Sequence, residues 1–185
     1  ESMRFEFTGQ FPPYIMAKDI LLQVIGDIGV DGATYRSMEW GGEAVMALSM
    51  EERMTLCNMA IEAGGKNGII EADQVTKEYN QGKTPIDGKF YNSDSDARYY
   101  YKKTYDASKM EPVVAKPHSP DNKALARECE DVKLDRCYIG SCTGGKTTDF
   151  IAAAKILKGN TVKIDTYIVP ATVEVEKDLS IQKID

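Results

Sequence analysis

The sequence contains no Cys-x-x-Cys pair and a single histidine, His118. Its four cysteines, Cys57, Cys129, Cys137 and Cys142, are therefore not spaced as the ligands of a zinc ribbon or as a dithiol redox site. A disulfide framework is not expected either. Cys57 and Cys137 lie in apolar surroundings and are interpreted as buried small hydrophobic residues. Cys142 differs, because it lies among Gly, Ser and Thr, where the backbone is expected to be open.

Long apolar runs and clusters of basic residues are absent as well. No stretch approaches the roughly 20 apolar residues that a membrane-spanning helix needs. The first residues, ESMRFEFTGQ, lack the layout of a secretory signal. The formal net charge is −6, with Lys and Arg scattered among acids, so nothing favours a nucleic acid backbone. We expect a protein of the cytoplasm or of an organelle matrix that binds neither membrane nor nucleic acid.

Strands and helices alternate along the chain, which is typical of an α/β protein. The clearest helix covers 49–64, because Ser49 and Glu52 can form a capping box and Gly64 with Gly65 can end the helix. We expect an exposed loop at 81–96 and a strand at 97–108 whose tyrosines pack in the sheet. The other predicted elements are strands at 3–9, 33–40, 67–73, 136–140 and 162–170, helices at 14–29, 41–48, 73–80 and 147–159, and a polar tail at 173–185.

Residues 137–147, CYIGSCTGGKT, match the phosphate-loop pattern G-x-x-x-x-G-K-[ST] through Gly140, Gly145, Lys146 and Thr147. A nucleotide site needs more than this loop, because several parallel strands must hold it and an Asp at the tip of another strand must hold magnesium. One further strand follows the loop, and Asp165 is predicted to lie in its middle. The pattern alone therefore argues weakly for a nucleotide.

The same turn places several backbone N–H groups at the start of a helix, which favours an anion of any kind. A thiolate is such an anion. The sequence therefore predicts a lowered pKa for Cys142 and a side chain suited to a soft metal, without saying which metal.

Two segments resemble the aconitase superfamily. Residues 138–159, YIGSCTGGKTTDFIAAAKILKG, resemble its Gly-Ser-Cys-Thr segment, and residues 47–73, ALSMEERMTLCNMAIEAGGKNGIIEAD, resemble its Cys-Asn-Met-x-x-Glu-x-Gly segment. AKPHSPDN at 115–122 is similar to the family's inter-domain connector. Within the superfamily, Gly-Gly-Lys-Thr after the cysteine, GATYRSMEWGGEAV and HSPDN most resemble the large subunits of the isopropylmalate dehydratases. The resemblance runs from about residue 5 to residue 172.

The resemblance implies a hydro-lyase that interconverts 2- and 3-isopropylmalate in leucine biosynthesis, with a [4Fe-4S] cluster and a small subunit as partner. Cys142 would hold one iron of the cluster, and Asn58 and Glu62 would face the cluster's water and the substrate. Asn58 and Glu62 lie four residues apart, which would place them on one face of a helix. From the sequence alone, Glu62 could equally be a solvated surface acid, although it lies in the helix's last turn, where the helix dipole disfavours a carboxylate.

Several parts of the family pattern are missing from the sequence. The Cys-x-x-Cys pair that completes the cluster is absent, as are the family's catalytic histidines, substrate-binding arginines and serine base. We therefore expect an internal piece of a large subunit, with an aconitase-like α/β/α second domain at 1–112, a proline-rich linker at 113–128, and the opening β-α-β of a third domain at 129–185. Such a piece alone should be inactive and should not retain the cluster.

Three alternatives remain open. A related dehydratase acting on homocitrate, citramalate or dimethylmalate would share every motif named above. A phosphate-loop protein would bind ATP or GTP through Lys146. A non-catalytic binding module would keep the fold without the chemistry. The sequence does not decide the substrate, the oligomeric state or the roles of Lys146, Thr147 and His118.

Overall fold

The computed structural model describes residues 1–83 and 88–184. The chain divides into two compact units, Glu1–Arg127 and Glu128–Asp185, which are described one at a time. Of the loop predicted at 81–96, residues 84–87 lie outside the described ranges. No helix of the described residues has the length and apolar character needed to cross a membrane.

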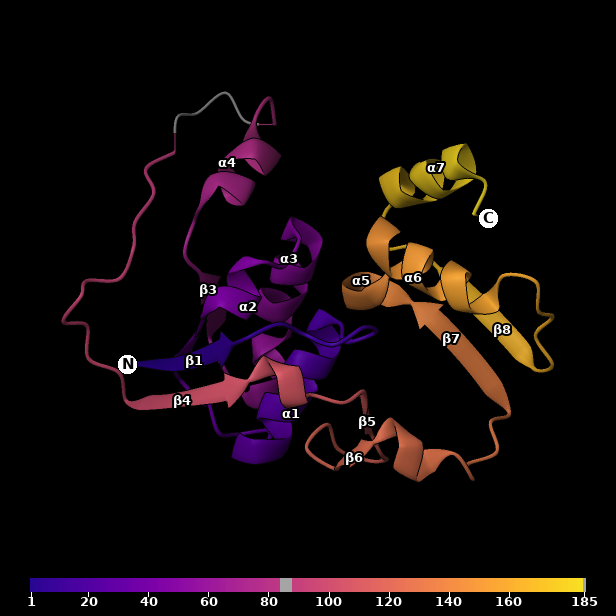
Figure 1. Ribbon diagram of the computed structural model, residues 1–185, viewed down its shortest axis with the longest axis horizontal. Coiled ribbons are helices and arrows are strands. Elements are labelled where there is room, and N and C mark those ends of the chain that lie inside the picture. The colour runs from indigo at the N-terminus through magenta and orange to yellow at the C-terminus, as the bar shows by residue number, and fades with distance from the viewer. Residues whose placement is uncertain (84–87, 185) are drawn as a thin grey trace. The chain divides into compact units, whose positions relative to one another are not determined.

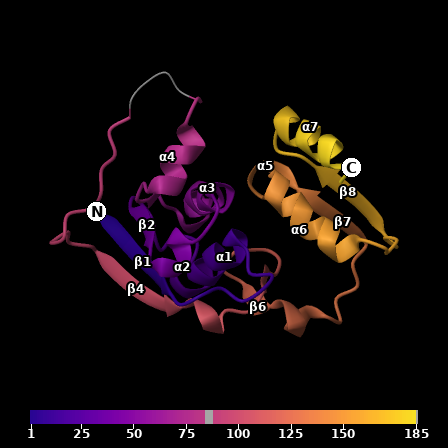
Figure 2. The same ribbon diagram turned by 45° about the horizontal axis from the view of Figure 1, so that its top comes forward.

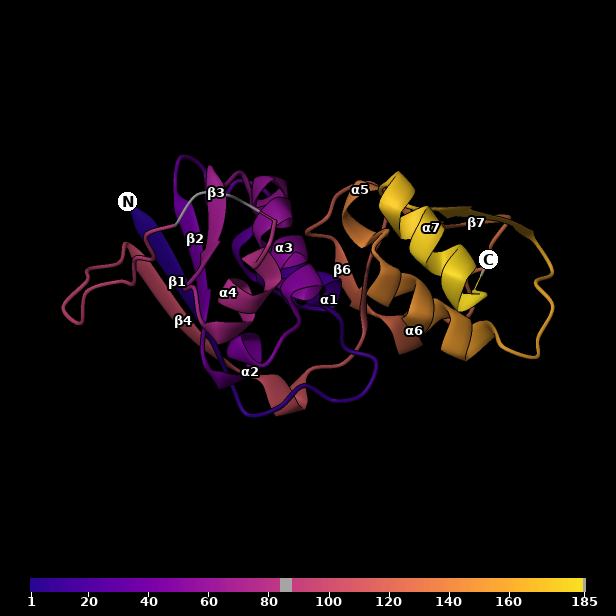
Figure 3. The ribbon, with the colours of Figure 1, turned by 90° about the horizontal axis from the view of Figure 1, so that it is seen from above.

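Unit 1 is built on a parallel four-stranded sheet in the order β3 (Asn67–Ile70), β2 (Ser37–Gly41), β1 (Ser2–Thr8) and β4 (Tyr101–Asp106). The helices of this unit are α1 (Ala17–Ile28), α2 (Glu43–Met46), α3 (Met50–Asn58) and α4 (Gln74–Asn80) (Figure 1). Viewed from above, the strands stand side by side with α1 and α3 on one face (Figure 3). This arrangement confirms the predicted α/β fold, and the structure adds that the strands of this unit are parallel.

The face of the sheet that α1 covers carries the core. In β1, Met3, Phe5 and Phe7 are buried and alternate with half-buried polar residues, as period-two strand geometry requires. Phe5 stacks on Trp40 with ring centroids 5.2 Å apart, and burial of each such large side chain contributes roughly 1.5–3 kcal/mol. Phe7 stacks on Tyr105 at 4.7 Å, so the expected packing of tyrosines in the sheet holds for this residue.

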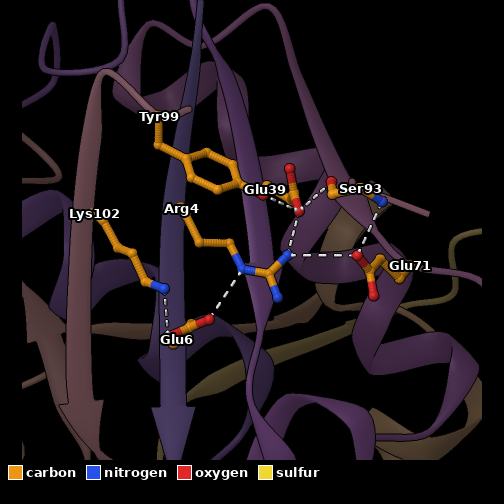
Figure 4. Close-up of polar contacts among 7 residues, drawn as sticks. All are labelled: Arg4, Glu6, Glu39, Glu71, Ser93, Tyr99 and Lys102. Carbon is orange, nitrogen blue, oxygen red and sulfur yellow. Dashed lines mark hydrogen bonds and ion pairs between the residues drawn. The ribbon is translucent and has the colours of Figure 1, made fainter. Parts of the chain in front are cut away.

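The other face of the sheet is polar, which is unusual for parallel strands. Glu39 of β2 is 5% exposed, and its Oε1 accepts hydrogen bonds from Arg4, from Ser93 Oγ at 2.9 Å and from Tyr99 OH at 3.0 Å (Figure 4). Ser93 and Tyr99 belong to the irregular segment that leads into β4. The last part of the β3-to-β4 connection therefore crosses this face, and its hydroxyls satisfy the buried carboxylate.

The helix predicted at 49–64 begins and ends as expected but changes type on the way. Ser49 Oγ accepts a bond from the Glu52 N–H, and Gly64 adopts a left-handed conformation with φ 78°. The α-helix ends at Asn58, and a 3₁₀ helix, η1 (Met59–Ala63), completes the segment. The two glycines close the segment in a Schellman motif, in which the N–H of Gly65 bonds to the Ala60 carbonyl and that of Gly64 to the Ile61 carbonyl. The prediction of one continuous α-helix was therefore wrong for its last turn.

Part of the segment predicted as a linker is a short hairpin in unit 1. After η2 (Ala107–Lys109), β5 (Val113–Ala115) pairs antiparallel with β6 (Lys123–Leu125). Asp19 of α1 holds the hairpin, since its Oδ1 accepts the Val113 N–H at 2.9 Å. The segment then continues into η3 (Ala126–Cys129), at the junction of the two units. The assignment of the two units to particular family domains remains a prediction.

Unit 2 contains the predicted crossover. β7 (Arg136–Gly140) and β8 (Asp165–Val169) are parallel and are joined through α5 (Ser141–Gly144) and α6 (Thr147–Leu157) (Figure 2). The polar tail was wrongly predicted, because it forms α7 (Val173–Gln182). Thr172 caps this helix by accepting the Val175 N–H, and Leu179 is 4% exposed. First-turn acids that favour a helix start were present in the sequence.

Candidate functional site

The turn that carries Cys142 depends on two glycines. Gly140 has φ 115°, and a Cβ at this position would lie 2.2 Å from the Val169 carbonyl oxygen. A Cβ at Gly145 would lie 2.2 Å from the Ser141 carbonyl oxygen. Ser141 itself has φ 84°, a strained conformation for a residue with a side chain. The chain therefore leaves the carboxyl end of β7 through a tight turn that other residue types could not form.

Cys142 lies exposed in this turn, in the single helical turn α5. The Ser141 hydroxyl donates to its sulfur at 3.8 Å, and the Thr143 hydroxyl lies 3.8 Å from the same atom. These hydroxyls, with backbone N–H groups of the turn, lower the pKa of the Cys142 thiol. The predicted direction is confirmed, although the hydroxyl of Ser141 contributes more than the backbone groups. Burial instead raises the pKa of the Cys57 thiol to about 11.

The turn does not have the arrangement that a phosphate loop needs. Residues 141–144 form a helical turn, and the Lys146 ammonium donates to the carbonyl of Thr143 within that turn. Asp165 is the first residue of β8, not a mid-strand residue as predicted. It pairs with Arg136 across the strands, whereas Gly140 pairs with Val169 at the far end. Four residues of β8, about 13 Å, therefore separate Asp165 from the carboxyl end of the strands, where the turn lies.

Glu62 lies in a hollow of unit 1. The hollow is lined by the start of α1, by η1 and by the hairpin strand β5, through Met16, Lys18, Asp19, Leu22, Met59, Glu62, Val113, Val114, Ala115 and Pro120. Glu62 is partly exposed, but its Oε2 is buried and has no hydrogen-bond partner among residues 1–83 and 88–184. An acid that simply faced solvent would leave both oxygens hydrated. The interpretation of Glu62 as a solvated surface acid is therefore not supported.

The hollow extends along α1 from its first turn to η1. In the order β3-β2-β1-β4, the connections from β1 lead to one side of the sheet and β4 lies on the other, so the direction reverses between β1 and β4. α1 follows the carboxyl end of β1, and β5 follows that of β4. η1 instead precedes the amino end of β3, so the hollow is not confined to the crevice outside the carboxyl ends of the strands, where such sheets commonly bind ligands.

Asn58 is exposed and is not among the residues that line the hollow. It is the last residue of α3, and the backbone between it and Glu62 is 3₁₀-helical. Four residues advance about 120° past a full turn in a 3₁₀ helix but only about 40° in an α-helix. The expected shared α-helical face of the two side chains is therefore not formed, and their joint role stays a proposal.

The thiol chemistry of Cys142 fits one ligand of an iron–sulfur cluster, because its pKa is lowered and its sulfur is accessible. Among the described residues, no three His, Cys, Asp or Glu side chains come together to hold a metal ion. The described part of the chain therefore does not bring together the three thiolates that a cluster with one open iron requires.

Similarity of sequence places the chain in a known family. The sequence profile of the aconitase family (aconitate hydratase) matches residues 1–128 and 122–185, and the chain belongs to this family. It is 56% identical over 180 residues to the chloroplastic large subunit of 3-isopropylmalate dehydratase from Arabidopsis thaliana. It is 47% identical to the corresponding large subunit of Moorella thermoacetica and 47% identical to large subunit 1 of Pyrococcus furiosus.

These alignments cover 96%, 95% and 88% of the chain but 35%, 42% and 39% of the respective relatives. The chain thus spans about two fifths or less of the length of these three proteins. The match therefore shows the family of this chain and not the activity of a whole large subunit.

Sequence reasoning missed two residues of the hollow, Lys18 and Asp19. Asp19 has a structural role, since its Oδ2 accepts the Met16 N–H at 2.9 Å and its Oδ1 accepts the Val113 N–H at 2.9 Å. Lys18 has no such structural role. A lysine in the first turn of a helix opposes the helix dipole, and this was a signal that the sequence already contained.

Proposed function

We propose that the chain is part of the large subunit of a 3-isopropylmalate dehydratase, which interconverts 2- and 3-isopropylmalate together with a small subunit. The observation that carries the proposal is identity of 45–56% over most of the chain with large subunits from a plant, bacteria and archaea. Both segments that bear the candidate site residues lie inside the family match.

In this proposal Cys142 supplies one thiolate to a [4Fe-4S] cluster. When bound, the cluster supplies a Lewis acid that assists the loss and return of hydroxide. The turn of Gly140 and Ser141 presents the thiolate, and the hydroxyls of Ser141 and Thr143 stabilise its negative charge. Lys146 helps to hold the turn, because its ammonium donates to the Thr143 carbonyl. This lysine therefore has a structural role that needs no phosphate.

Asn58 and Glu62 would serve the substrate side of the reaction. The buried Glu62 Oε2 lacks a donor among the described residues, and a substrate hydroxyl or a water would supply one. Asn58, exposed at the end of α3, can donate or accept through its amide. Loss of either side chain should lower turnover while leaving the cluster in place.

The test is reconstitution of the full-length large subunit with its small subunit, iron and sulfide under anaerobic conditions. The wild-type complex should dehydrate 2-isopropylmalate, and Cys142→Ser should lose both activity and the visible absorbance of the cluster. Cys129→Ser, which changes a half-buried cysteine outside the turn, is the matched control and should keep both. Preference for citramalate, homocitrate or dimethylmalate would replace the proposed substrate, and a Cys142→Ser protein with full activity would refute the role of Cys142.

A further inference from the structure

The last part of the β3-to-β4 connection, residues 93–99, lies as a strap over the polar face of the sheet in unit 1 (Figure 4). Both of its ends are held by carboxylates. Ser93 donates twice, from its N–H to Glu71 Oε1 at 3.2 Å and from its hydroxyl to Glu39 Oε1 at 2.9 Å. Tyr99 donates its hydroxyl to the same oxygen of Glu39 at 3.0 Å. The position of the strap therefore depends on Ser93 acting as a hydrogen-bond donor.

Carboxylates outnumber cations in the ion pairs under the strap. Arg4 pairs with Glu39, and its Nη1 lies 4.0 Å from Glu71 Oε1. Glu6 pairs with Arg4 Nε at 3.4 Å and with Lys102 Nζ at 3.3 Å. One guanidinium is thus shared by three carboxylates. A further negative group on this end of the strap would lie beside two of these carboxylates and would find the guanidinium already engaged.

The strap is itself acidic at the end that carries Ser93. It reads Ser93-Asp94-Ser95-Asp96, and all four residues are exposed. Local electrostatics does not explain acids beside a face rich in carboxylates, where a lysine or arginine would be favoured. Serine kinases that select acidic substrates use basic side chains to recognise carboxylates one and three residues after the serine. Ser93 has both acids, whereas Ser95 has only the first, because Arg98 stands three residues after it.

We propose that Ser93 is a phosphorylation site for an acid-directed serine kinase and that its phosphoryl group releases the strap from the sheet. In the transfer, the Ser93 hydroxyl oxygen bonds to the terminal phosphorus of ATP, the bond between that phosphorus and ADP breaks, and the hydroxyl proton passes to a base of the kinase. The inference goes beyond the proposed function and does not depend on it, since it concerns neither Cys142 nor Asn58 and Glu62.

The release follows from the added charge and from the loss of a donor. A phosphoserine carries a charge of about −1.5 to −2 at neutral pH and presents acceptor oxygens where the hydroxyl had donated. Glu39, which is 5% exposed, would lose one of its donors and gain a like charge beside it. The same repulsion would draw the Ser93 N–H away from Glu71. We therefore expect the strap to leave the sheet while the apolar face on the other side stays packed.

The first test maps the modified residue. The full 185-residue chain is incubated with ATP and casein kinase 2, an acid-directed serine kinase, and the product is mapped by tandem mass spectrometry. Ser93 should carry the phosphoryl group, and Ser93→Ala should abolish modification of the strap. Ser95→Ala, the matched control at an exposed serine two residues away, should leave it unchanged. Asp96→Asn should slow the transfer by about tenfold, because the kinase loses one contact between charged groups.

The second test measures release of the strap. Trypsin cleaves after Arg98, an exposed residue of the strap, and the rate reports how often the strap opens. Phosphorylation should raise this rate by about tenfold or more, as expected from losing a hydrogen bond to a charged group and gaining a like charge. Cleavage after Lys109, which is exposed outside the strap, should not change and separates local release from unfolding. Glu71→Gln removes a repelling carboxylate and should make the increase smaller.

Three results would overturn the inference: no phosphoryl group on Ser93, modification of Ser95 at the same rate, or an unchanged rate of cleavage after Arg98 in the phosphorylated chain. Ser93→Ala removes the hydroxyl bond without adding charge, so it should raise cleavage less than phosphorylation does. An equal increase would show that charge plays no part, contrary to the proposal. Ser93 is exposed, so Ser93→Ala should keep the fold, which a matching thermal unfolding curve would verify.

Discussion

Replacing Arg53 by methionine should strongly destabilise unit 1. Arg53 is 2% exposed, and its Nε donates to the carbonyl of Leu48 at 3.1 Å while a terminal nitrogen donates to that of Met46. The same guanidinium donates two hydrogen bonds to the Asp73 carboxylate, of 2.7 and 2.9 Å. Asp73 also caps α4 by accepting the Thr76 N–H at 3.2 Å. One buried side chain thus joins α2, the start of α3 and α4.

The magnitude follows from these contacts. The guanidinium holds the pKa of Asp73 at about 2, below its ordinary 3.8, which corresponds to roughly 2 kcal/mol before screening. Since the Asp73 side chain is 30% exposed, we assign about half of this to the pair. Each carbonyl that loses its donor adds about 1 kcal/mol. Arg53→Met should therefore cost about 3 kcal/mol, a large share of the stability of an ordinary domain.

Asp73→Asn should cost a similar amount, because it leaves the buried guanidinium without its counter-charge. The pH dependence follows from the lowered pKa of the folded state. The contribution of Asp73 is present above about pH 4, where the unfolded carboxyl is ionised, and is lost as pH falls toward about 2. Asp73→Asn should flatten the stability curve over this range.

Urea unfolding followed by the fluorescence of Trp40 measures unit 1 directly, since Trp40 is the single tryptophan and is fully buried. Arg127→Met, which breaks an exposed pair with Glu111, is the control and should stay within about 0.5 kcal/mol of wild type. The reasoning is refuted if Arg53→Met also stays within that range, or if the wild type and Asp73→Asn lose stability equally between pH 4 and 2.

Two further predictions concern the turn in unit 2. Iodoacetamide at neutral pH should modify Cys142 at least tenfold faster than Cys57. Cys142 is exposed and its thiol has a lowered pKa, whereas burial raises the pKa of Cys57 to about 11. Peptide mass mapping measures the two rates, and equal rates would contradict the prediction. Gly140→Ala should unfold or distort the turn and lower the free energy of unfolding by roughly 1–3 kcal/mol, because φ is 115° and the new Cβ would collide with the Val169 carbonyl. Gly159→Ala is the control, since this glycine also has a positive φ but open space around it. Equal losses of stability in the two variants would show that the collision is unimportant.

Local patterns predicted most of the individual elements. Ser49 and Glu52 marked the start of α3, and alternation in the first strand marked Phe5 and Phe7 as core residues. These signals work because capping and period-two burial depend on neighbours in the sequence. The strand order could not be derived in the same way, since the pairing of β4 with β1 joins residues nearly a hundred positions apart.

The roles of the candidate residues Cys142, Asn58 and Glu62 stay predictions, and the sequence could not give the geometry around them. Cys142 was identified from its surrounding glycines, which also explain its turn. The hollow beside Glu62 depends on Asp19 holding Val113 across 94 residues, and no local pattern encodes that contact. Glu39 shows the same limit, because its burial in a parallel strand is tolerated through hydroxyls that arrive from a distant loop.

Two of the three charged residues that line the hollow, Lys18 and Glu62, are placed where the backbone disfavours them. Lys18 lies at the amino end of α1, and Glu62 lies near the carboxyl end of the α3–η1 segment. Exchanging either for a residue of neutral or opposite charge should be neutral or stabilising for its own helix. Sequences generally conflict with local rules at functional sites. These two conflicts, together with the buried Glu62 Oε2 that lacks a donor among the described residues, make the hollow the part of unit 1 that local stability explains least.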